Sequence, residues 1–162
     1  MHDRRICGYR VWKLTTESEL RSITLATVWP VGKPLKAECR CGWWKVGVTH
    51  PQHESPATTE QGSGCGIHAV YRPDTPVMMT GEANVRGVVV CHGVKEFHEI
   101  GFRAQYAEPI CLYEHLTHRR PEWTKRMKEV SSKYGIPIVD RAYLNSFASE
   151  HGTLIDPKSE FA

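Results

Sequence analysis

The segment GEANVRGVVVCHG, residues 81–93, decides the fold class of this chain. Its centre, residues 88–90, is a run of three valines, and β-branched side chains fit the pleated surface of a buried strand. The next apolar segment, GFRAQYAEP at residues 101–109, alternates Phe102, Ala104 and Tyr106 with Arg103 and Gln105. A period of two residues is typical of a strand, and Pro109 is expected to end that strand or to mark a sheet edge.

Four stretches before these two also predict strands. GYRVWKL at residues 8–14 alternates in the same way, and LRSIT at residues 20–24 follows the polar turn TTESE as its hairpin partner. A loop with two prolines and a glycine then leads to a strand at residues 35–39. GIHAVY at residues 66–71 is the fourth, and Arg72 and Pro73 close it.

The hydrophobic period changes from Thr117 onward. Between Pro121 and Gly135 four apolar side chains share one face of a helix of about 3.6 residues per turn: Trp123, Met127, Val130 and Tyr134. Asp140 is a candidate N-cap for a second helix that ends near Gly152, and the last ten residues are expected to be frayed. The pattern predicts an α+β protein: a β-rich domain with a mostly antiparallel sheet at residues 1–116, and a helical C-terminal extension at residues 117–162 packed on it.

Composition narrows the class of protein. A chain of 162 residues with 40% hydrophobic content is large enough for one core and small for two. It has no apolar run of eighteen residues, and MHDRRICGYR at its start lacks the apolar stretch of a secretory signal, so we expect a cytoplasmic protein without membrane contact. In a reducing compartment its six cysteines favour metal ligation or free thiols over disulfides.

Several separated blocks carry a resemblance to a known family. They run in the order GYRVWKL, WPVGKPLKAEC, HESP, CGIHAV, GEANVRGVVV and GFRAQYAEP, within residues 8–113. This order resembles a family of small actinobacterial and actinobacteriophage proteins that share W-P-x-G-x-P-L-x-A-x-C, C-x-C-G-I-Y-A and G-[WF]-R-A-x-Y-A-x-P motifs. The resemblance implies a common β-rich fold and no particular activity. Two departures are Ser63, in place of the first cysteine of C-x-C-G, and His68, in place of the tyrosine.

A structural zinc ion is one hypothesis for the polar stretch between residues 39 and 65. Cys39, His53 and Cys65 match recurrent positions of the family, and zinc prefers four thiolate or imidazole ligands. Cys41 is the fourth ligand if Ser63 has removed one, with His50 as the substitute. The alternative is that these are ordinary thiols beside histidines on a solvated loop.

An enzyme is a second hypothesis. The strand Gly66-Ile67-His68-Ala69 is similar to the G-I-Y-F-A strand of poly-ADP-ribose polymerases, in which the aromatic residue stacks on nicotinamide. The resemblance implies an early donor-binding residue, for which Arg10 is available, and a late glutamate, for which Glu82 or Glu108 is available. The alternative is a plain core strand with His68 at its edge.

Two further groups of residues suggest binding. A basic cluster on and before the C-terminal helix, represented by Arg119, Arg120, Arg126 and Lys133, would suit phosphate contacts, although Glu122 and Glu129 interrupt it. Trp43 and Trp44 are adjacent, so both cannot face one core, and exposed tryptophans favour interfaces.

No catalytic set emerges from these motifs. We therefore favour a phage-type accessory protein that binds a host macromolecule, in the first instance a host protein, without catalysis and within the host cytoplasm. The alternatives are an ADP-ribosyltransferase-like enzyme and a nucleic-acid-binding protein. The sequence does not specify the oligomeric state.

Overall fold

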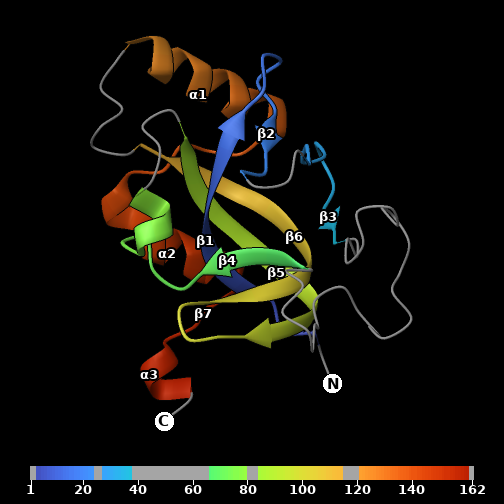
Figure 1. Cartoon of the computed structure of the whole chain (residues 1–162). Coiled ribbons are helices and arrows are strands. Elements are labelled where there is room, and N and C mark those ends of the chain that lie inside the picture. The colour runs from blue at the N-terminus through green and yellow to red at the C-terminus, as the bar shows by residue number, and fades with distance from the viewer. Residues whose placement is uncertain (1–2, 24–26, 38–65, 80–83, 115–120, 161–162) are drawn as a thin grey trace.

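The structure is a computed structural model of the 162-residue chain, and it describes residues 3–23, 27–37, 66–79, 84–114 and 121–160 (Figure 1). The strands are β1 (Ile6–Leu14), β2 (Leu20–Arg21), β3 (Leu35–Lys36), β4 (Ile67–Val70), β5 (Val85–Phe97), β6 (Gly101–Tyr113) and β7 (Thr153–Leu154). The helices are η1 (Pro76–Met79), α1 (Pro121–Tyr134), η2 (Arg141–Tyr143), α2 (Leu144–His151) and α3 (Pro157–Glu160), where η marks a 3-10 helix. In the described part of the chain no helix combines the length and the apolar character that crossing a membrane requires.

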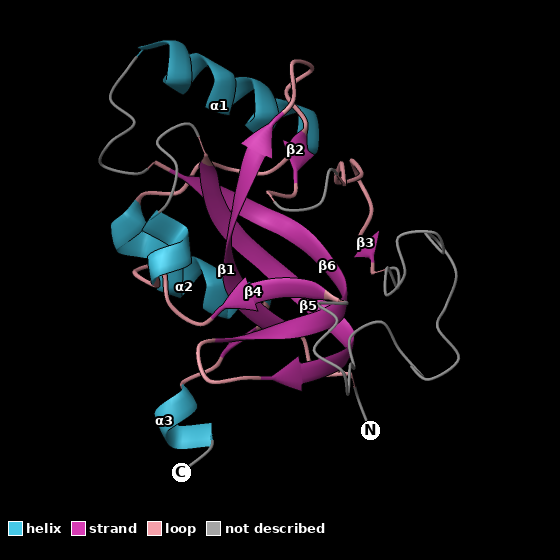
Figure 2. Cartoon of the chain, in the orientation of Figure 1, coloured by secondary structure: helices cyan, strands magenta, loops and turns pink. Residues whose placement is uncertain are grey.

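The strand pairing closes into a ring. β1 pairs with β5, β5 with β6, β6 with β4, and β4 returns to β1, in each case antiparallel. β2 and β3 extend this sheet with antiparallel pairs, whereas β7 pairs in parallel with β1. The predicted class, a β-rich α+β fold with a mostly antiparallel sheet and helices at the C-terminal end, is confirmed (Figure 2).

β5 and β6 are the longest elements, as the sequence predicts, but Pro109 does not end β6. The strand continues to Tyr113, and its register against β5 passes from Val88 opposite Cys111 to Val89 opposite Pro109. Ile110 is therefore the extra residue of a β-bulge. A bulge interrupts the ladder, so a proline without an N–H can lie beside it at little cost.

Helices cover both faces of β5, which explains its continuous run of valines. Val89 lies in the core that α1 completes with Met127 and Val130. Val88 and Val90 lie in a second core, which α2 completes with Leu144 and Ala148. A strand with two buried faces needs apolar residues at successive positions.

The C-terminal helices follow the predicted pattern, but the end of the chain does not. α1 spans the predicted residues, with Gly135 in the left-handed region at φ 65°, and Asp140 caps η2 by accepting a hydrogen bond from the N–H of Ala142. The expectation of frayed final residues is wrong. Thr153–Leu154 is a strand on β1, and Ile155 enters the core that β1 and β5 share. Burial of this side chain holds the segment in place.

Candidate functional site

A row of charged side chains crosses three neighbouring strands. Arg103 of β6 lies opposite His68 of β4 on one side and opposite Glu96 of β5 on the other. Directly opposed residues of antiparallel strands project from the same face, so the three side chains are neighbours. His98 follows β5 in the turn and joins them. We call His68, Arg103, Glu96 and His98 the charged row.

Arg103 is the centre of the charged row. Its Nη2 donates to Oε1 of Glu96, and its Nε lies 3.2 Å from Nε2 of His98. The same Nε2 lies 3.0 Å from Oε1 of Glu96, so a neutral His98 can accept from Arg103 and a protonated one can donate to Glu96. The sequence alternation places Arg103 on the face opposite Phe102, but these partners leave it only 5% exposed.

Arg10 of β1 borders the charged row. One terminal nitrogen donates to the carbonyl oxygen of His68, and the other donates to Oγ of Ser22 at 3.1 Å. The guanidinium carbon lies 4.9 Å from the ring centroid of Trp29, a cation–π distance. Its Nε is buried without a hydrogen-bond partner, and burial lowers the pKa of Arg10 to about 10.

His68 lies in a positive field. Partial burial, together with the charges of Arg10 and Arg103 and the proximity of His98, lowers its pKa to about 4, and Glu96 opposes that shift. The imidazole of His68 is therefore neutral at pH 7. It combines an exposed side chain with two guanidinium neighbours.

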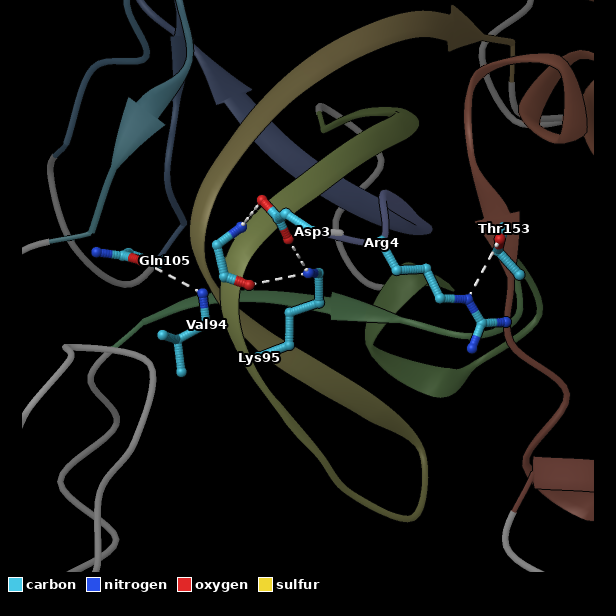
Figure 3. A network of polar contacts seen from close by, with 7 residues as sticks. Asp3, Arg4, Val94, Lys95, Gln105 and Thr153 are labelled. Carbon is cyan, nitrogen blue, oxygen red and sulfur yellow. Dashed lines mark hydrogen bonds and ion pairs between the residues drawn. The ribbon is translucent and has the colours of Figure 1, made fainter. Parts of the chain in front are cut away.

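Polar contacts hold the bulge of β5 in the hairpin that carries Glu96, His98 and Arg103 (Figure 3). Asp3 accepts from the backbone N–H of Gly93 at 2.7 Å and from Nζ of Lys95 at 2.9 Å, and the Lys95 hydrogen bond lowers the pKa of Asp3. Gln105 accepts from the N–H of Val94 at 3.3 Å through its side-chain oxygen. Gly93 has φ 78°, a left-handed conformation that suits glycine at such a bulge.

The end of the β5–β6 hairpin, residues 94–101, is apolar on its outside. Val94, Phe97 and Ile100 are 42%, 39% and 61% exposed. The turn is held by two hydrogen bonds: the N–H of His98 donates to the carbonyl oxygen of Gly101, and the hydroxyl of Tyr71 donates to that of His98 at 2.7 Å. We call residues 94–101 the hairpin end.

The sequence-based site predictions fall partly beyond this description. The predicted zinc ligands and four of the predicted binding residues lie outside the described residues: Cys39, Cys41, His53, Cys65, Trp43, Trp44, Arg119 and Arg120. Among the described residues there is no group of three or more histidine, cysteine, aspartate or glutamate side chains that could hold a metal ion.

The two described members of the basic cluster contact the protein itself. Arg126 donates to the carbonyl oxygen of Thr15 at 3.0 Å, and Lys133 donates to that of Glu17 at 2.9 Å. Both carbonyl groups belong to the turn between β1 and β2. These two side chains thus attach α1 to that hairpin.

Among the residues that the enzyme hypothesis named, Arg10 lies beside β4, because it donates a hydrogen bond to the carbonyl oxygen of His68. Of its two candidate glutamates, Glu82 lies outside the described residues and Glu108 lies opposite Val90 in the β5–β6 ladder. The glutamate of the charged row is Glu96, which the hypothesis did not name. Only the register of β5 against β6 reveals this, and no local motif encodes that register.

The described cysteines are not nucleophiles. Cys7, Cys91 and Cys111 are buried free thiols, and burial raises the pKa of Cys7 to about 11, that of Cys111 to about 12, and that of Cys91 still further. A thiol with such a pKa is protonated at pH 7 and does not attack an electrophile. These residues serve as small core side chains.

Comparison with known proteins adds no relative. No family model, no curated protein and no solved structure matches the chain.

Proposed function

We propose that the protein acts by binding another protein through the hairpin end, without catalysing a reaction. The observation that carries this proposal is the exposure of three large apolar side chains, Val94, Phe97 and Ile100, within seven consecutive residues. For the phage-type accessory protein that the sequence analysis favours, the partner would be a protein of the host.

The hairpin end has the layout of a binding surface. Its exposed apolar side chains are bordered by polar ones that are accessible to water, namely Glu96, His98 and Glu99. Interfaces commonly combine such a centre with a polar rim that remains accessible to water.

Rigidity also favours binding. The ring of Phe97 packs against Phe102 with centroids 5.9 Å apart, and Tyr71 and Asp3 hold the backbone on either side. A surface that is already ordered loses little conformational entropy when a partner binds.

The test compares two variants with matched chemistry. Phe97→Ser combined with Ile100→Ser removes two apolar side chains that are 39% and 61% exposed, whereas Val31→Ser removes one elsewhere that is 44% exposed. A host protein captured by the unaltered chain is purified, and its affinity is measured by calorimetry. We expect the double variant to lose about 30-fold or more, because a hot spot contributes about 2 kcal/mol or more. The control should bind normally, and equal binding by the double variant would refute the proposal.

A further inference from the structure

We propose that the protein binds a zwitterionic ligand, an apolar amino acid or a short apolar peptide, in a cleft beside Tyr9. The cleft has a volume of about 450 Å³ and lies between the end of β4, the start of α2 and the segment that follows β7. Pockets for small ligands commonly measure about 300–1,000 Å³. The described residues that line the cleft include none from the hairpin end, so this site is independent of the protein-binding surface proposed above.

The sheet topology explains why a cleft forms at this place. β5 occupies one edge of β1 from Ile6 to Trp12, so β4 and β7 pair with the other edge. β4 runs antiparallel to β1 and reaches Tyr9, whereas β7 runs parallel to β1 and reaches Cys7. The two strands therefore approach each other along β1 and end on either side of Gly8. The chain leaves the sheet after each of them, and α2 lies across the gap, because the hydroxyl of Tyr9 donates to Oδ1 of Asn145.

Charges of both signs line the cleft. Arg72 and Asp74 follow β4, Arg141 begins η2, and Asp156 follows β7, and all four residues are exposed. None of the ion pairs that the described residues form includes Arg72, Asp74 or Arg141. The two positive and two negative charges cancel, so the cleft favours neither a simple anion nor a simple cation. A ligand that carries one charge of each sign can pair with both kinds of side chain.

The rest of the lining matches an apolar amino acid. Because Oδ1 of Asn145 accepts from Tyr9, the amide nitrogen Nδ2 of the same side chain can donate to a ligand carboxylate. Guanidinium groups such as those of the two cleft arginines bind a carboxylate in a fork. Pro73 and Leu154, both half-buried, supply apolar surface for the side chain of the ligand.

Asp74 is the partner of the ligand ammonium group. Oδ1 of Asp156 already accepts a hydrogen bond from the backbone N–H of Lys158 at 3.0 Å, at the start of α3. Asp74 has no such commitment among the described residues. The ligand is thus held at one end by the arginines and the Asn145 amide, and at the other end by Asp74.

The experiment compares four ligands with the same side chain at pH 7. L-leucine and L-leucyl-L-leucine are zwitterions, N-acetyl-L-leucine is an anion, and L-leucinamide lacks the carboxylate. Binding is measured by NMR from the side-chain amide of Asn145, with that of Gln105, which lies at the bulge of β5, as the internal control. We expect one zwitterion to bind about tenfold or more tightly than either analogue, because each analogue loses a charge-assisted hydrogen bond. Tighter binding of leucine would assign the site to free amino acids, and tighter binding of the dipeptide would assign it to peptides.

Two variants of exposed side chains separate the two ends of the ligand. Arg141→Met should weaken the binding of leucine and of N-acetyl-leucine alike, by about tenfold or more. Asp74→Asn should weaken the binding of leucine but not that of N-acetyl-leucine, which has no ammonium group. The matched control is Arg21→Met, because Arg21 is an arginine of β2 that does not line the cleft.

Three results would overturn the proposal. They are the absence of binding by both zwitterions at millimolar concentration, equal binding by N-acetyl-leucine or leucinamide, and full leucine binding by both Arg141→Met and Asp74→Asn.

Discussion

Replacing Tyr134 with phenylalanine removes a single oxygen atom that connects α1 to the sheet. The hydroxyl accepts a hydrogen bond from the backbone N–H of Leu20 at 2.9 Å and donates one to the carbonyl oxygen of Trp29 at 2.8 Å. Both residues are buried, so water does not replace the lost partner. A buried donor or acceptor left unsatisfied costs about 1–3 kcal/mol, and two such groups together cost about 2–6 kcal/mol. This is a large part of the roughly 5–15 kcal/mol that stabilises an ordinary domain.

Urea unfolding followed by circular dichroism measures this cost. We expect Tyr134→Phe to lower the midpoint without changing the slope m, because the variant alters stability and not the surface exposed on unfolding. Tyr143→Phe is the matched control: Tyr143 is exposed, and its variant should stay within about 0.5 kcal/mol of the unaltered protein. A loss below about 0.5 kcal/mol for Tyr134→Phe would show that the hydroxyl does not bridge β2 and the segment at Trp29.

Two further predictions concern pH and metal. Folding lowers the pKa of His68 from 6.5 to about 4. Between these two pH values the unfolded chain binds a proton at His68 and the folded chain does not. The free energy of unfolding should therefore fall as the pH decreases through that window. His68→Gln should flatten this part of the stability–pH curve, and an unchanged curve would contradict the electrostatic account of the charged row. If zinc is bound through Cys39, Cys41, His53 and Cys65, elemental analysis should find about one zinc per chain. Cys65→Ser should then lower both zinc content and melting temperature, whereas indifference to chelator would contradict a zinc site.

Local patterns were sufficient to predict the main elements. The valine run at residues 88–90 and the alternation at residues 101–109 identified β5 and β6, and the apolar face ending at Tyr134 identified α1. Each of these signals lies within one element and reflects how that element buries a face. Pro109 shows the limit of local rules, because the bulge that accommodates it depends on the pairing with β5.

The charged row was not predictable, because it depends on contacts between residues far apart in the chain. His68 and Arg103 are 35 positions apart, and only the register of β4 against β6 sets them opposite each other. No periodic pattern reports such a register. The sequence predicts which residues form each strand, but it does not predict which residues of neighbouring strands lie opposite each other.

Burial and close backbone approach together explain why that register holds. A slip of one residue in β4 would turn Ile67 and Ala69, both buried, to the face that His68 now occupies. β4 also passes close to its neighbours on both sides. A Cβ added to Gly101 would lie 2.2 Å from the carbonyl oxygen of Ala69, and one added to Gly8 would lie 2.8 Å from its Cβ. The ring closes only because glycines flank Ala69, and this closure also brings Arg10 of β1 to the backbone of His68. The packing that closes the sheet therefore also places Arg10 beside the charged row.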